Sequence, residues 1–123
     1  MSRVGSPLRA AMLLVSATTV AAAPAPEPGD LAQLREAARE ALRPSCGRCH
    51  DHGQPTGRPA ALRVFDLQEA DWSARVTDEQ MDHMVGRFES FKMPQADRVT
   101  VQRFLDAERT RRASAPPPAE PGH

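Results

Sequence analysis

Two thiols and an imidazole stand close together in this 123-residue chain. Cys46 and Cys49 are its only cysteines, and His50 directly follows the second of them. Side chains three positions apart share one face of a helix, so the two sulfurs can reach one ligand together. The pattern Cys-x-x-Cys-His is the attachment signature of c-type haem. The spacing therefore predicts one haem c, bound covalently by Cys46 and Cys49, with His50 as an axial ligand of its iron.

Three other uses of these residues compete with haem. A zinc site would need His52 and His83 to complete its ligands, but structural zinc normally takes four ligands from two separated clusters. A redox-active cysteine pair usually stands at a helix N-terminus beside a βαβ pattern, which this sequence lacks. A disulfide between the two cysteines would close a very short loop, and such a loop gains little stability from a crosslink. All three stay open as alternatives.

A haem iron held by one histidine has a second axial position. Met93 is the first candidate for it, because a thioether is the common partner of histidine in cytochromes c. Pro94 disfavours the helical region for the residue before it, which keeps Met93 in an extended strap. His83 is the alternative, giving two axial histidines. Met81 and Met84 fall on the apolar stripe of a predicted helix, so we expect them in the core.

With these residues the chain resembles a small monohaem class I cytochrome c domain. The likeness runs over about residues 30–112: a helix, the Cys-x-x-Cys-His motif, a loop, a capped helix, Met93-Pro94 and a closing helix. The resemblance implies that the first and last helices cross and cover one haem edge. It also implies that a carbonyl near Pro55 or Pro59 accepts a hydrogen bond from His50.

The haem propionates need cationic or hydrogen-bonding partners. Four side chains lie in the segment that could wrap the propionate edge: Arg58, Arg63, Trp72 and Arg75. Solvation at the surface is the alternative for each arginine.

The N-terminal segment has the layout of a secretory signal. Arg3 and Arg9 precede the apolar run 10–23, which ends in small residues suited to signal peptidase. The run is shorter than the roughly 20 residues that a membrane span needs. We expect cleavage after Ala22, export of the mature chain to the periplasm, and no membrane span in the mature form.

Three further segments follow the predicted signal peptide, residues 1–22. Residues 23–29 form a Pro-rich linker and residues 113–123 a disordered Pro-rich tail. The remaining residues, 30–112, form one domain. Such a small domain has few large apolar side chains for its core and often needs a disulfide, a metal or another crosslink to be stable.

Apolar periodicity in the domain predicts an all-α fold of three main helices. The first helix follows Asp30 and ends at Arg43, before Pro44; a short apolar stretch, 61–67, could then be a helical turn or extended. Thr77 and Gln80 form a capping box that starts the second helix, which runs to about Ser90. The third helix runs from Ala96 or Asp97 to Arg111. The predicted core residues are Leu31, Leu34, Ala38, Ala41, Leu42, Met81, Met84, Val85, Phe88, Val101, Phe104 and Leu105.

The chain has 16 Lys+Arg and 16 Asp+Glu, interspersed. This balance argues against a nucleic-acid partner. If protein fills both axial positions, substrate cannot reach the iron, so the predicted function is single-electron transfer by a monomer through transient contacts with redox proteins, and not enzyme catalysis. Two alternatives remain: a five-coordinate haem sensor or weak peroxidase, and a haem-free interaction module held by a disulfide or zinc.

Overall fold

A computed structural model describes residues 28–117, 119 and 121–122 of the chain. Within these residues the regular structure is entirely helical, with α1 (Pro28–His50), α2 (Pro59–Leu62), α3 (Asp78–Gly86) and α4 (Gln95–Ser114) and no strand. The prediction of an all-α fold is confirmed for this part of the chain. The predicted signal peptide, 1–22, and residues 23–27 of the predicted linker lie outside the described residues.

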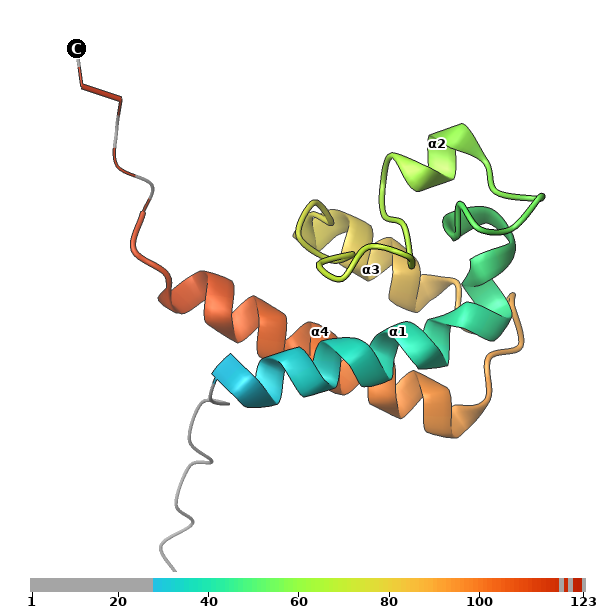
Figure 1. The fold of residues 1–123 in the computed structure, drawn as a ribbon. Coiled ribbons are helices and arrows are strands. Elements are labelled where there is room, and N and C mark those ends of the chain that lie inside the picture. Colours follow the sequence, from blue (N-terminus) through green and yellow to red (C-terminus); the bar gives the residue numbers. More distant parts are fainter. Residues whose placement is uncertain (1–27, 118, 120, 123) are drawn as a thin grey trace, which may run out of the picture.

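The two long helices, α1 and α4, cross and form the most extensive helix–helix contact (Figure 1). Ala38 and Leu42 of α1 and Phe104 and Leu105 of α4 are fully buried in one core cluster. The helix α3 packs on α4, and α2 packs near the end of α1. The α1–α4 pair is thus the base on which the shorter elements rest.

Helix α1 continues through Pro44, so the prediction that it ends at Arg43 is wrong. A proline inside a helix removes one hydrogen bond and costs roughly 3 kcal/mol. Packing of the helix before and after the proline offsets this cost. Leu42 and Gly47 are buried on either side of Pro44, and the proline ring itself is exposed to solvent. The last part of α1 turns away from the first part in Figure 1, as expected of a proline kink. The Cys-x-x-Cys-His motif therefore ends a helix that the core already holds.

The second predicted helix begins as expected and ends early. Thr77 accepts a hydrogen bond from the Gln80 amide at 3.1 Å, and the Gln80 side chain accepts one from the Thr77 amide at 2.9 Å, so the capping box is confirmed. The helix α3 ends at Gly86, not near Ser90. Beyond it the amides of Arg87 and Phe88 bond three residues back, which tightens the chain into turns and buries Phe88.

The outer boundaries of the predicted domain also shift by a few residues. Helix α1 starts at Pro28, inside the predicted linker, because a proline at the first helical position has no hydrogen bond to lose. Helix α4 runs from Gln95 to Ser114, inside the predicted tail. The four-residue helix α2 begins at Pro59 and includes only the first two residues, Ala61 and Leu62, of the apolar stretch that could be either helical or extended.

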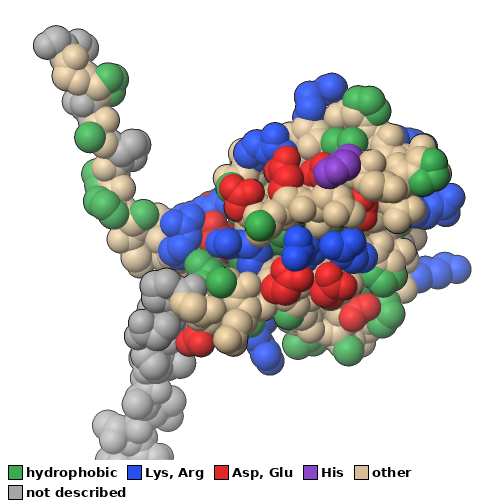
Figure 2. Space-filling view, viewed as in Figure 1, with side chains coloured by type: hydrophobic (Ala, Val, Ile, Leu, Met, Phe, Trp, Pro, Cys, Tyr) green, Lys and Arg blue, Asp and Glu red, His purple; other side chains and the backbone are tan. Residues whose placement is uncertain are grey.

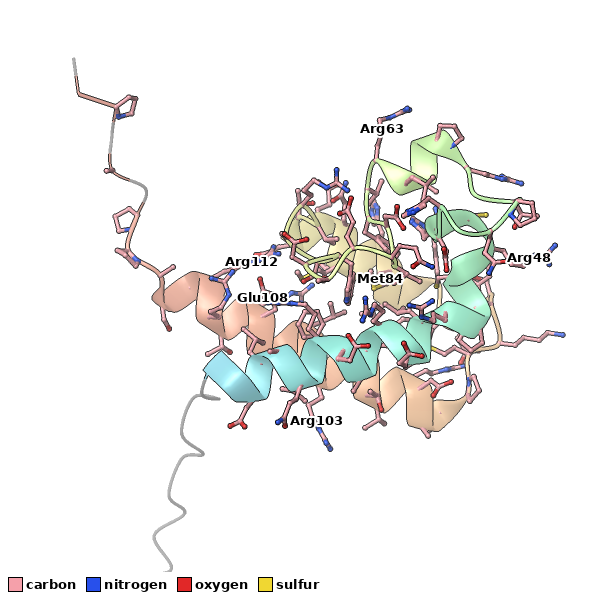
Figure 3. The ribbon with its side chains drawn as sticks, in the orientation of Figure 1. Arg48, Arg63, Met84, Arg103, Glu108 and Arg112 are labelled. Atoms are coloured by element: carbon pink, nitrogen blue, oxygen red, sulfur yellow. The ribbon has the colours of Figure 1, made fainter. Side chains whose placement is uncertain are left out.

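Glu108 is at the centre of a hydrogen-bond network that links the end of α4 to the segment before α3. Its carboxylate is 2% exposed and accepts hydrogen bonds from Arg111 at 2.8 Å and from Arg112 at 3.0 Å. Arg112 in turn donates to the carbonyls of Ser73 at 3.1 Å and Val76 at 2.7 Å. Figure 3 shows Glu108 and Arg112 side by side on α4. This network joins the last helix to the segment that precedes α3.

Stability should fall in acid partly through Glu108. Burial raises the pKa of this carboxyl, but hydrogen bonds from Arg111 and Arg112 outweigh burial and hold the pKa below its usual value of 4.5. A lowered pKa gives stability above the unfolded value and loses it as pH falls through the folded value. Glu108→Gln should cost about 2 kcal/mol at pH 7, less than a fully buried pair because Arg111 is exposed, and should flatten the pH dependence below pH 4.5. Urea unfolding from pH 7 to pH 3 measures both effects.

The control for this prediction is Glu40→Gln, which removes a carboxylate that is 61% exposed and pairs with Arg43 at the surface. This control should change the unfolding free energy by less than about 1 kcal/mol. Equal losses in the two variants would contradict a special role for Glu108.

The connection between α3 and α4 is a tight strap. Lys92 has a φ of 51°, in the left-handed region that favours glycine. The Met93 amide donates to the Phe88 carbonyl at 3.0 Å, and the Lys92 amide to the Glu89 carbonyl at 2.9 Å. These two bonds form a Schellman-type turn with Lys92 at the position where glycine is most common.

Lys92→Gly should therefore stabilise the protein. Glycine adopts a positive φ without the steric cost of a Cβ, although it also loosens the unfolded chain. The expected gain is roughly 0.5 kcal/mol in the free energy of unfolding. A loss measured by urea titration would show that the lysine side chain makes a compensating contact.

Charges of both signs are interspersed on the face shown in Figure 2, where blue and red side chains lie next to one another. Surface pairs include Arg75 with Glu69 at 3.0 Å and Arg98 with Glu89 at 3.0 Å. No helix among the described residues is long and apolar enough to cross a membrane.

Candidate functional site

Cys46, Cys49 and His50 share the last turn of α1 and line one cavity. Both thiols are half-buried and unbonded. The sulfurs stand three positions apart on one helical face, as the motif requires. Helix α1 thus brings the three predicted site residues together at one wall of the cavity.

Cys46 has the character of a protected thiol. Burial raises its pKa to about 11, and Cys49 adds to this rise, while the Arg87 cation opposes it. The thiol is therefore protonated at neutral pH. Redox-active pairs need a lowered pKa and usually lie at a helix N-terminus, whereas this pair lies at a C-terminus. The surroundings argue against a thiol–disulfide exchange site.

His50 is oriented by the chain that follows it. Its Nδ1 lies 3.1 Å from the Phe65 carbonyl oxygen, which can only accept, so Nδ1 carries the proton and Nε2 offers a lone pair. Burial lowers the pKa of the imidazole, although the bond to Phe65 works against burial. A neutral ring with one nitrogen fixed by a carbonyl is the arrangement of a metal-binding histidine. The carbonyl comes from Phe65, and not from near Pro55 or Pro59 as the resemblance implied.

An aromatic row continues from His50 into the core. The His50 and Phe65 rings are stacked, with centroids 3.7 Å apart and an interplanar angle of 3°. The Trp72 ring lies 5.6 Å from Phe65 and 5.4 Å from Phe104 of α4. The orientation of the imidazole is therefore coupled to the packing of the whole domain.

Two backbone hydrogen bonds hold the intervening loops against the end of α1. The Arg58 amide donates to the Cys49 carbonyl at 3.1 Å, and the Leu67 amide donates to the His50 carbonyl at 2.7 Å. These are carbonyls at a helix end, which have no partner inside the helix. The loops thus donate hydrogen bonds to the free carbonyls at the end of α1 and are held beside the site.

The side chain of Asp51, the residue after α1, holds the loop that follows this helix. Its buried carboxylate accepts hydrogen bonds from the Gly53 amide at 2.8 Å, from the Gln68 side chain at 2.8 Å and from Arg43 at 3.4 Å. The carboxylate joins α1 to both loop segments. The site is thus built on a rigid frame.

The cavity has a volume of about 980 Å³, at the upper end of the usual range for ligand sites. Ala60, Ala61 and Val64 give it an apolar side. Its charged lining residues other than histidine are Arg48, Arg58 and Arg87, and no described acidic residue lines it. An apolar wall with a cationic rim suits a large, flat, hydrophobic group that bears carboxylates.

The candidates for the second axial position occupy different places. Met93 is 2% exposed and is not among the residues that line the cavity. His83 and Met84 of α3 do line it. His52 lies outside the lining, with its Nδ1 2.6 Å from the Asp66 carboxylate. The structure therefore brings two α3 side chains to the cavity and keeps Met93 in the core beside it.

Of the four candidate partners for propionates, only Arg58 lines the cavity. Trp72 is buried and its Nε1 donates to the Arg35 carbonyl at 3.2 Å, while Arg75 pairs with Glu69. Arg63 is exposed and points away from the body of the protein (Figure 3). The structure therefore brings Arg58, and not Arg63, Trp72 or Arg75, to the cavity.

Sequence reasoning missed two cationic residues of the cavity, Arg48 and Arg87. Arg48 lies within the motif itself, at the end of α1 (Figure 3). Arg87 follows Met84 by three positions and Gln80 by seven, and all three line the cavity. That helical spacing was the signal that could have identified Arg87.

Among the described residues, no group of three or more Cys, His, Asp and Glu side chains is placed to hold a metal ion. The two cysteines, His50 and the cationic rim do fit a haem, with the thiols available for two vinyl groups and the arginines for the propionates. Comparisons with protein-family models, curated proteins and solved structures return no match for this chain.

Proposed function

We propose that this chain is an exported c-type cytochrome that carries single electrons. Cys46 and Cys49 would hold one haem c covalently, and His50 would bind its iron. The observation that carries the proposal is the position of these three side chains, on one turn of α1, at the wall of a single large cavity. The apolar wall and the cationic rim support it.

The chain's own residues prepare the site. The Phe65 carbonyl holds the His50 proton on Nδ1, which leaves Nε2 as a neutral donor that could bind the iron. The stacked Phe65 ring restricts rotation of the imidazole, and two backbone hydrogen bonds hold the following loops against the end of α1. Arg48, Arg58 and Arg87 line the cavity and would pair with the two propionates. When bound, haem c supplies a centre that gains and loses one electron.

A second axial ligand from the protein, Met93 by the sequence pattern, would leave no open position for a substrate. For this reason we propose a carrier and not an enzyme. Its partners are redox proteins that dock transiently, and the working form is a monomer in the periplasm. Export follows from the predicted signal peptide, residues 1–22.

The test is expression of the full chain in a host with a cytochrome c maturation system. We expect a red periplasmic protein whose intact mass equals residues 23–123 plus one haem, with a low-spin absorption spectrum and a reversible one-electron potentiometric titration. A colourless protein with the mass of its amino acids alone would overturn the proposal. A high-spin spectrum with binding of carbon monoxide would favour the sensor instead.

A further inference from the structure

One stripe of side chains from α3 and the residue that follows it forms part of the cavity wall. Gln80, His83 and Met84 of α3 and Arg87, directly after its end, fall on this stripe at helical spacing and line the cavity. The capping box at Thr77 fixes where the helix begins and so fixes the register of the stripe. The position of Met84 at the cavity is therefore a property of a regular, capped helix.

Met84 and His83 differ in depth. Met84 is 8% exposed, and its neighbour His83 is exposed to solvent. A buried thioether is shielded from water, whereas an exposed imidazole is hydrated. Of the two, Met84 is therefore the better suited to a ligand position that is closed to water.

Met93 is held elsewhere by its backbone. Its amide donates to the Phe88 carbonyl at 3.0 Å, and its own carbonyl accepts from Arg98 Nε at 2.7 Å. Arg98 also pairs with Glu89 at 3.0 Å, which closes the strap. With the backbone fixed on both sides and the side chain 2% exposed, Met93 packs in the core and does not face the cavity.

We infer that Met84, and not Met93, is the methionine that supplies the second axial ligand. This inference rests on the proposed function, because it concerns the same haem. A thioether is the common partner of histidine in cytochromes c. The role of Met93 is then to pack the core beneath the strap.

The test compares Met84→Leu, Met93→Leu and His83→Gln in the full holoprotein, with leucine as a substitution of similar volume in both methionine variants. We expect Met84→Leu to abolish the far-red sulfur-to-iron absorption band, to lower the reduction potential and to open a site for carbon monoxide. Met93→Leu should keep the band and the potential, and should lower the urea midpoint. His83→Gln should leave the band unchanged.

Met84→His provides a second test, in which a new absorption spectrum is expected and not only the loss of the sulfur-to-iron band. An imidazole at position 84 should replace the sulfur band with the low-spin spectrum of two axial histidines. Loss of the band in Met93→Leu with its retention in Met84→Leu would overturn the inference, as would a wild-type protein with haem but no sulfur band. Absence of covalent haem from the wild-type mass would instead overturn the proposed function, so the two failures are distinguishable.

Discussion

Replacing both Cys46 and Cys49 with serine should give a colourless, unstable protein. The double variant keeps His50, its Phe65 carbonyl and the cationic rim, but loses both sites of covalent attachment. Haem held only by its axial ligands and by packing should dissociate during purification. Without haem the domain has a cavity of about 980 Å³ where a large apolar group would complete a small core. Intact mass, Soret absorption and thermal unfolding measure the effect.

The single variant Cys49→Ser, which keeps one of the two attachment sites, should have an intermediate effect. It should retain haem through one thioether, at lower yield, or give unfolded apoprotein where attachment fails. The matched control is Ser90→Ala, an exposed position outside the cavity lining, which should have wild-type colour and mass. A double cysteine variant that still carries haem after denaturation would contradict covalent attachment at this motif.

Phe65→Ala should produce a large loss of stability although it leaves the ligands in place. Phe65 is 5% exposed, stacks on His50 and contacts the aromatic row that ends at Phe104. Removing a buried phenylalanine costs roughly 3–5 kcal/mol. The variant keeps the backbone carbonyl that orients His50 but frees the ring to tilt. Urea unfolding should show the loss, and electron paramagnetic resonance a broader distribution of imidazole orientations.

The control for this prediction is Val99→Ala, at a position that is 47% exposed and outside the cavity lining. Surface substitutions of this kind change stability by about 0.5 kcal/mol or less. A loss in Phe65→Ala no larger than in the control would show that the aromatic row contributes little to the fold.

Local patterns predicted the parts of the fold that local interactions determine. The capping box at Thr77 was visible because both partners lie within four residues, and the apolar stripes of α1 and α4 were visible because burial repeats with the helical period. The passage of α1 through Pro44 could not be predicted in this way. The continuation of α1 through Pro44 depends on how both halves of the helix pack against segments distant in sequence. Rules for proline that consider only neighbouring residues do not include this packing.

The site divides along the same line. That Cys46, Cys49 and His50 lie together was predictable, because five consecutive residues carry the whole motif. The Phe65 carbonyl and Arg87 are separated from the motif in sequence and reach it only through the turns around α2 and through α3. The assignment of Met93 as an axial ligand stays a prediction. The sequence shows a methionine before a proline, but not where its side chain lies.

Trp72 gives this protein a built-in optical probe. It is the only tryptophan of the chain, it is buried, and its ring lies 5.6 Å from the phenylalanine that stacks on His50. A porphyrin held by that histidine would accept the excitation energy of the indole and leave the folded holoprotein nearly dark. Emission would appear when the chain opens or when the pigment is missing, so one fluorescence trace would report both loading and unfolding.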